Sequence, residues 1–243
     1  MVAASRLARA QRSMTDAKAY GAANQAVFEQ SDAAHSEAKI EKILYVVTSS
    51  DRGLCGGIHS SVAKFARKDI LEGEGLGKDV SRFHFIPQLA LVARLTRLPL
   101  SQITIVALGE KPKQQLSRGG PTADNMALSF NQIGRSVPTF ADALAIADKI
   151  ESEGYEFDKL KVVHNAFVSV IAYESRSIDI YSSKALSASP SFAAYEVEGA
   201  ELAADLESFA MANAIYAGLV EGYAAEVSAR RNAMENASKN AEE

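Results

Sequence analysis

The sequence predicts an α/β fold in which a small domain with a mainly parallel sheet lies between two long helices. Three observations lead to this prediction. Apolar residues recur three and four positions apart near both ends of the chain, and short runs rich in Val and Ile alternate with amphipathic stretches between them. Because strands that alternate with helices favour parallel pairing, the middle segment is expected to form one α/β layer structure.

The first predicted helix runs from Val2 to about Asp32, a stretch without proline. Met1 to Thr15 also carries three arginines and no acidic residue before Asp16, as a mitochondrial transit peptide does, so that alternative stays open. The heptad spacing nevertheless continues past this stretch, which favours a helix packed closely on a partner. Its seam comprises Leu7, Ala10, Met14, Ala17, Gly21, Asn24 and Phe28.

The last predicted helix is longer and keeps the same spacing over five heptads. Its seam comprises Leu206, Phe209, Asn213, Tyr216, Val220, Tyr223, Val227, Arg230, Met234, Ala237 and Ala241. No Gly or Pro stop signal precedes Glu243, so we expect a helix that is cut rather than finished. The two terminal helices are predicted to pair as a long antiparallel coiled coil.

Between the helices we expect a small Rossmann-like α/β domain. Ile43–Thr48 is predicted to be a strand, residues 49–57 a loop and residues 58–71 a helix. Thr139 is the predicted N-cap of a helix over residues 139–152, because it follows Pro138 and precedes an amphipathic stretch. Further strands are predicted at residues 103–108, 127–130, 161–164 and 168–173, with 178–182 as a possible partner of the last.

Composition excludes several classes of protein. The formal net charge of −4 provides no basic surplus for binding nucleic acid, and the single cysteine, Cys55, rules out an internal disulfide framework. The longest apolar stretch is interrupted by Pro87, Arg94 and Arg97, so no membrane span is expected. The four histidines are scattered singly, which gives no metal-ligand spacing, and no cofactor is predicted.

The most specific local feature is the loop Ser50-Asp51-Arg52-Gly53-Leu54-Cys55-Gly56-Gly57. Glycines before a helix can expose backbone amides to a phosphate, so a Rossmann-like nucleotide-binding enzyme that uses the Gly53 to Gly57 segment is one hypothesis. The loop lacks both the P-loop and the dinucleotide patterns, and a tight turn that requires positive φ is the more common interpretation. Cys55 could be a nucleophile activated by Arg52 and the helix N-terminus, but no residue is marked as an orienter for His59, and a half-buried turn residue is favoured.

Three segments resemble the gamma subunits of F-type ATP synthases: residues 1–7, residues 48–60, and residues 222–241 with the core Ser228-Ala229-Arg230-Arg231-Asn232-Ala233-Met234. They occur in the family's order. The forms at residues 58–60, 137–140 and 189–192 look like the mitochondrial, fungal branch. The resemblance implies a non-catalytic rotor of the central stalk, peripheral to the matrix side of the mitochondrial inner membrane, which couples proton-driven rotation to ATP synthesis at the beta-subunit sites. Its implied partners are the alpha and beta subunits, the delta and epsilon subunits and the membrane ring of c subunits.

The resemblance also implies which residues make subunit contacts. The loop residues Asp51, Arg52, Gly53, Leu54, Cys55 and Gly56 would lie near the lower part of the beta subunits. Arg230, Arg231 and Met234 would face the stator or the opposing helix, and Met1 corresponds to an internal methionine of the family. With Cys55 alone, the thiol switch of the chloroplast forms cannot operate. We therefore expect a coiled-coil helix at 1–38, an α/β foot domain at 39–200 and a second coiled-coil helix at 201–243.

Two departures from the family are expected to matter. Family members extend beyond both ends of this sequence, which suggests a gene model truncated at both ends. Residues 80–102 form an atypical insertion where relatives have only a short link. A retained intron is one hypothesis, since valine codons begin with GT, glutamine can be encoded by CAG and Leu95-Thr96 can encode a branch motif; a lineage-specific surface insertion is the other.

Overall fold

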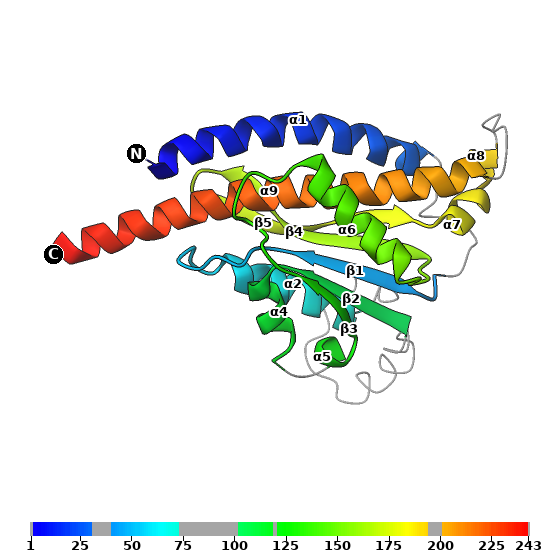
Figure 1. Ribbon diagram of the computed structural model, residues 1–243, viewed down its shortest axis with the longest axis horizontal. Coiled ribbons are helices and arrows are strands. Elements are labelled where there is room, and N and C mark those ends of the chain that lie inside the picture. Colours follow the sequence, from blue (N-terminus) through cyan, green and yellow to red (C-terminus); the bar gives the residue numbers. More distant parts are fainter. Residues whose placement is uncertain (1, 31–39, 73–101, 119–120, 194–200, 243) are drawn as a thin grey trace, which may run out of the picture.

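The structure is a computed structural model that describes residues 2–30, 40–72, 102–118, 121–193 and 201–242. Figure 1 shows a central twisted sheet with helices on both faces and two long helices that run side by side along one face. Among the described residues, no helix is both long enough and apolar enough to cross a bilayer.

The sheet has five strands in the order β3-β2-β1-β4-β5. Their bounds are β1 Ile43–Thr48, β2 Ile103–Leu108, β3 Met126–Phe130, β4 Lys159–Ser169 and β5 Ala172–Tyr181. All neighbouring strands are parallel except β4 and β5, which form an antiparallel hairpin. The chain adds strands on one side of β1 and then returns to its other side, so the order reverses between β1 and β4.

The central strand β1 is buried on both faces, as expected of a parallel strand covered by helices. Leu44 and Val46 belong to one apolar cluster and Tyr45 and Val47 to another. Successive side chains of a strand point to opposite faces, so this continuous apolar run supplies both cores at once. The helices that cover the two faces are α2 Ile58–Glu72 and α4 Glu110–Leu116 on one, and α6 Phe140–Ser152 and α9 Glu201–Glu242 on the other. Three short helices complete the described elements: α5 Pro121–Asp124, α7 Ser183–Ser187 and α8 Pro190–Ala193.

Helix α6 begins where the sequence predicts. The Thr139 side chain accepts a hydrogen bond from the backbone N–H of Asp142, and the Asp142 carboxylate accepts one from the backbone N–H of Thr139. This capping box satisfies two N–H groups that the first turn would otherwise leave unpaired. Thr139 therefore stabilises the start of the helix that supports α9 on this face of the sheet.

The N-terminal helix α1, Val2–Gln30, packs on α9 in the opposite chain direction (Figure 1). Leu7 and Ala10 share an apolar cluster with Tyr223 and Val227. Farther along α1, a β-carbon on Gly21 would lie 3.5 Å from the β-carbon of Ala217, so the two backbones approach closely there. The terminal helices thus lie side by side, as predicted.

A polar cluster joins α1, α9 and the sheet. Glu221 of α9 binds His164 Nε2 of β4 with one carboxylate oxygen and Lys18 Nζ of α1 with the other, each at 2.7 Å. Burial by itself would raise the pKa of Glu221, but the hydrogen bonds from His164 and Lys18 outweigh it and keep the pKa below its ordinary value. Glu221 is therefore held as a carboxylate between two partners from different elements.

The predicted elements are confirmed at 43–48, 58–71, 103–108, 127–130 and 139–152, apart from one-residue differences in their bounds. Two strand predictions are wrong in extent. The strand expected at 161–164 is part of the longer β4. Residues 168–173 are not one strand but comprise the end of β4, a turn at residues 170–171 and the start of β5. Residues 178–181 pair with the start of β4 rather than with 168–173. A run of β-branched residues is typical of strands, but here Val168 and Ile171 stand exposed at the hairpin tip.

The heptad seam of the last helix also differs from the prediction. Phe209 and Met234, both predicted in the seam, are 53% and 48% exposed. Residues 210–215 and 223–228 are buried without interruption, because α1, α6 and the sheet contact α9 from different sides. The atypical block at residues 80–102 lies, except for Gln102, outside the described residues.

Candidate functional site

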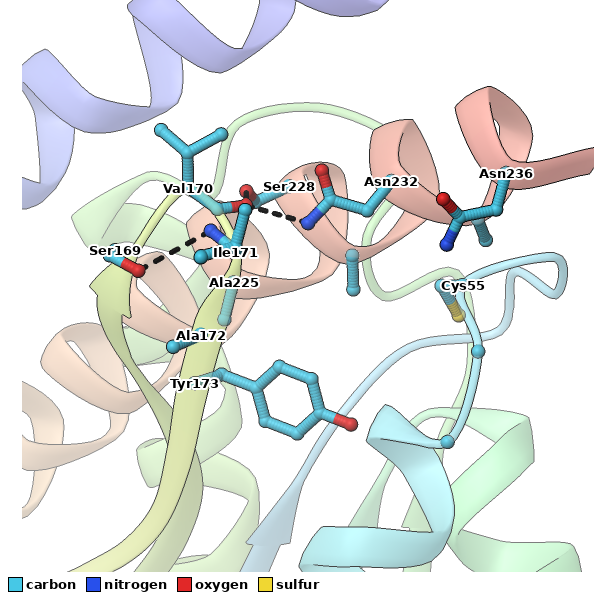
Figure 2. A pocket seen from close by; sticks show the side chains of 14 residues that line it. Cys55, Ser169, Val170, Ile171, Ala172, Tyr173, Ala225, Ser228, Asn232 and Asn236 are labelled. Atoms are coloured by element: carbon cyan, nitrogen blue, oxygen red, sulfur yellow. Dashed lines mark hydrogen bonds between the residues drawn. The ribbon is translucent and has the colours of Figure 1, made fainter. Parts of the chain in front are cut away.

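The loop at residues 49–57 lies at the carboxyl end of β1, beside the carboxyl end of β4, where the strand order reverses. In doubly wound sheets this position is the usual crevice for a ligand. Here α9 crosses it. Figure 2 shows Ala225, Ser228 and Asn232 of α9 between Cys55 of the loop and the β4–β5 hairpin.

Asp51 fastens the loop to the neighbouring strand ends. Its Oδ1 accepts a hydrogen bond from the backbone N–H of Glu110 at 2.7 Å, and its Oδ2 accepts one from the backbone N–H of Gln132 at 2.6 Å. Glu110 opens α4 after β2, and Gln132 follows β3. One carboxylate therefore joins the ends of three parallel strands, and its position at the N-terminus of α4 is electrostatically favourable.

Two glycines allow the loop to approach this closely. Gly109 has φ +107, and a β-carbon there would lie 2.9 Å from the Cα and carbonyl carbon of Ser50. Gly134 has φ +81, and a β-carbon there would lie 2.6 Å from the β-carbon of Ser50 and 3.0 Å from the Glu226 carboxylate. Both positions require glycine for conformation and for space.

The loop is also tied to the C-terminal helix. Arg230 donates from Nε to the carbonyl oxygen of Gly53 at 3.3 Å, and its guanidinium forms an ion pair with the buried carboxylate of Glu226 one helical turn earlier. A buried carboxylate without a partner would be costly. Arg230 therefore neutralises Glu226 and holds the loop against α9 at the same time.

The environment of Cys55 shows that the thiol is not an activated nucleophile. His59 Nε2 lies 2.7 Å from the carbonyl oxygen of Arg52 and 2.9 Å from Cys55 Sγ, while Nδ1 lies 2.7 Å from Ser49 Oγ. A carbonyl oxygen can only accept, so Nε2 carries the hydrogen and Nδ1 accepts from the Ser49 hydroxyl. The imidazole therefore has no free lone pair directed at the thiol.

The pKa values agree with this assignment. Burial raises the pKa of the Cys55 thiol, although Arg230 nearby acts in the opposite direction. Burial lowers the pKa of His59, although its hydrogen bond to Arg52 opposes the shift. A neutral thiol beside a neutral imidazole is a packed structural unit rather than a catalytic pair. The predicted half-buried cysteine is in fact fully buried, and the orienter of His59 is the hydroxyl of Ser49.

The outer part of the loop is exposed. Leu54 has φ 60 and its side chain is 80% exposed, and Gly56 has φ 65. The left-handed conformation costs a non-glycine residue about 1 to 2 kcal/mol. The turn therefore holds an apolar side chain in solvent at the expense of folding free energy, a combination that is typical of contact sites.

A pocket of about 240 Å³ remains between the loop, the hairpin and α9. Typical sites for small molecules measure about 300 to 1,000 Å³. The adjacent crevice is occupied by the ion pair of Glu226 and Arg230. Among the described residues, no three His, Cys, Asp or Glu side chains are placed to hold a metal ion. The geometry of the loop therefore does not favour a nucleotide site at the Gly53 to Gly57 segment.

The structure brings most of the residues singled out in the sequence into one site. Residues 51–56 and Arg230 lie together there, and Arg231 and Met234 are exposed on the following turns of α9. Met1 lies outside the described residues. Sequence reasoning did not identify Glu226, Ser228, Asn232 and Val170 as site residues. Only the spacing of Glu226 and Arg230, four residues apart with opposite charges, could have indicated one of them.

Comparison with known proteins adds independent information. A family model described as ATP synthase matches residues 1–243. Mitochondrial ATP synthase gamma subunits are similar to this chain: that of Yarrowia lipolytica is 42% identical over 99% of the chain and 73% of its own length, and that of Rattus norvegicus is 37% identical over 99% and 79%. The gamma subunit of Saccharomyces cerevisiae is 34% identical over 99% of this chain and 71% of its own length.

A solved structure shares the fold. A chain from the central stalk and c-ring of the Tetrahymena thermophila mitochondrial ATP synthase superimposes with a TM-score of 0.64 at 22% identity. The match covers 98% of this chain and 100% of the other. A chain from the Euglena gracilis mitochondrial ATP synthase, in its first rotational state, gives a TM-score of 0.60 at 14% identity, with 98% and 90% of the two chains covered.

Proposed function

Because this chain belongs to the family of ATP synthase gamma subunits, we propose that it is the central-stalk rotor of a mitochondrial F-type ATP synthase. In this role it couples proton-driven rotation to ATP synthesis and is itself non-catalytic. The family match over the whole chain is the observation that carries the proposal. The course of α9 supports it, because the helix fills the crevice where an enzyme with a doubly wound sheet would bind its ligand and then continues beyond the α/β domain (Figure 1).

The coupling is a shift of populations. A shaft that is not symmetric about its axis makes different contacts with three chemically identical catalytic sites. Each contact stabilises a different conformation of its site, so turning the shaft changes which conformation each site adopts. We propose that α1 and α9 form this shaft as an antiparallel coiled coil, with residues 1–38 and 201–243 in the shaft and residues 39–200 in the foot.

The partners follow from the same role. The similar solved structures come from mitochondrial ATP synthase complexes that include the c-ring. We propose that the shaft contacts the alpha and beta subunits and that the foot contacts the delta and epsilon subunits and the c-ring. The chain would then be peripheral to the inner membrane, on the matrix side.

The candidate contact residues divide into two groups by the role that each has in the structure. Arg52, Leu54, Arg231 and Met234 present exposed side chains to a partner. Asp51, Gly53, Cys55, Gly56 and Arg230 shape the loop and fasten it to α9. We propose that the first group touches the stator directly, that the second group holds it in place, and that Met1 belongs to the contact surface of the shaft.

Replacement of Leu54 by Asn tests this division. Asn tolerates the left-handed conformation, so Leu54→Asn should fold at least as stably as the parent chain. It removes an apolar contact of up to about 2 kcal/mol and should weaken association with a hexamer of alpha and beta subunits. The matched control is Leu144→Asn on the exposed side of α6, which should leave association unchanged. Equal effects of both variants would contradict a contact at the loop.

Nucleotide titration of the isolated chain separates the rotor from the alternative enzyme. The rotor needs no nucleotide on this chain, so calorimetric titration with ATP should show no saturable binding. Submillimolar binding that disappears when Gly56 is replaced would support the enzyme hypothesis instead. Reconstitution of the chain with alpha and beta subunits provides the positive test, with ATP-driven rotation as the measurement.

A further inference from the structure

The β4–β5 hairpin tip holds α9 from the side opposite to the loop. The carbonyl oxygen of Val170 accepts hydrogen bonds from Ser228 Oγ at 2.5 Å and from Asn232 Nδ2 at 2.7 Å (Figure 2). Ser228 and Asn232 are four residues apart and share one side of the helix. One backbone carbonyl at the tip therefore binds two successive turns of α9.

The two hydrogen-bonded sides of α9 face in opposite directions. At about 100° per residue, Arg230 lies about 180° around the helix from the midpoint of Ser228 and Asn232. Arg230 binds the carbonyl oxygen of Gly53 in the loop. The helix is thus held between two backbone carbonyls, one on each side. We name this arrangement the collar and define it as Gly53, Val170, Ser228, Arg230 and Asn232.

The remaining two sides of the same turns differ from the collar in chemistry. Val227 packs against α1 in an apolar cluster. Ala225, Ala229 and Ala233 face the pocket of about 240 Å³, which lies between the two hydrogen-bonded sides. In these last buried turns, apolar packing and small alanine side chains restrict the rotation of the helix about its own axis less than hydrogen bonds do, because the hydrophobic effect has no preferred direction.

Hydrogen bonds do fix that rotation, since they weaken steeply when donor and acceptor are misaligned. The collar is also placed where the foot last holds the helix: residues 234–242 of α9 are exposed and project beyond the α/β domain (Figure 1). We infer that Ser228 and Asn232 are positioning residues that fix the rotational angle of α9 relative to the foot, so that torque passes between foot and shaft at the hairpin tip. This inference rests on the proposed rotor function.

The double variant Ser228→Ala/Asn232→Asp tests it with almost no change in volume. Both donors to the Val170 carbonyl are lost, and Asp places a negative charge beside that oxygen. In the full chain, the loss of these two hydrogen bonds should raise the equilibrium constant for opening of the tip about 30-fold, because each bond makes a modest net contribution to stability. Hydrogen exchange of residues 169–173 measures this change. The matched control, Asn131→Asp/Ser136→Ala, makes the same chemical changes at exposed positions after β3 and should leave that exchange unchanged.

The deciding measurement is made in a complex reconstituted around this chain. With one probe on the foot and the hexamer fixed, the double variant should broaden the angular fluctuations of the foot and reduce the work delivered against a load, while unloaded ATP hydrolysis stays as in the parent. Single variants should give intermediate broadening. Angular fluctuations equal to those of the parent and the control, in a complex that rotates, would overturn the role of the collar and leave the rotor function intact. A parent chain that does not assemble or rotate would instead overturn the rotor function.

Discussion

Gly109 and Gly154 both adopt positive φ, but their surroundings differ. A β-carbon on Gly109 would collide with backbone atoms of Ser50, whereas one on Gly154 would meet nothing within 4 Å. Gly154→Ala should therefore cost only the left-handed conformation, about 1 kcal/mol. Gly109→Ala should add the collision and cost about 3 kcal/mol or more. Urea denaturation of the two variants measures the difference, and equal costs would show that the Ser49 to Gly57 loop can move away from β2.

His59 should make the stability of the protein depend on pH. Because burial lowers its pKa from the ordinary value near 6.5, the unfolded chain binds more protons than the folded chain just below that value. The free energy of unfolding should fall as the pH drops from 7 toward 5 and should recover as the pH rises again. His59→Gln keeps a donor for the Arg52 carbonyl but does not titrate, so its denaturation midpoint should vary less with pH over this range. An unchanged slope in the variant would assign the dependence to other groups.

At the scale of single residues, the sequence already indicates that the loop after β1 is special. It indicates neither the tautomer of His59, which follows from the carbonyl of Arg52 and the hydroxyl of Ser49, nor the burial of Cys55, which follows from its packing against Ala225 of α9. These partners are fixed by the path of the folded loop. No spacing rule for catalytic residues describes such a network.

At the scale of elements, α9 is closely packed on two sides, and a glycine lies at each of these two contacts. A β-carbon on Gly218 would lie 2.9 Å from Val162 Cγ1 of β4, whereas one on Gly21 of α1 would make an ordinary contact with Ala217. Gly21→Ala should stabilise the protein by about 0.5 to 1 kcal/mol, because alanine favours the helix. Gly218→Ala should destabilise it by about 1 to 3 kcal/mol, because the β-branched Val162 in a packed strand cannot yield. Thermal denaturation measures both, and a common sign would contradict the packing described for α9.

The wrong strand prediction at 168–173 belongs to the same scale. Val168, Val170 and Ile171 form an apolar run, which alone favours a strand. In the structure the run lies at the hairpin tip, and Val170 is in the turn outside the β4–β5 pairing, so its carbonyl oxygen can accept hydrogen bonds from α9. Local propensity cannot distinguish these outcomes, because the same side chains suit a sheet interior and a contact surface.

At the scale of the whole molecule, α1 is the least firmly held of the large elements. Its contacts are mainly with α9, whereas β1, β2 and β4 are buried within the sheet. Native-state hydrogen exchange should therefore find α1 opening at a lower free energy than these strands. Glu221→Gln removes the charge that binds Lys18 and His164 and should increase exchange in α1 while β1 stays protected. Lys18→Met, which retains the aliphatic stem, should have a smaller effect, because its charge is half exposed.

Equal increases of exchange in α1 and β1 would show that the helix and the sheet unfold together. The same outcome would mean that Glu221 contributes to global stability rather than to the attachment of α1. The distinction bears on the proposed shaft, which must stay paired while the foot is under load.

The sequence by itself determined the elements whose signals are local. The two long helices follow from apolar spacings of three and four residues, the strands β1 and β2 from short runs rich in Val and Ile, and the start of α6 at Thr139 from capping chemistry within a few positions. The resemblance of three segments also indicated the family, which the comparisons confirmed.

Only the tertiary structure decided how α9 meets the α/β domain. Arg230 and Gly53 are 177 positions apart, and Asn232 and Val170 are 62 apart. Hydrogen bonds of this kind leave no periodic trace in a sequence, because each depends on where two distant backbones come to lie. The helix in the crevice, the buried Glu226 and the two-sided hold on the shaft are therefore properties of the packed molecule.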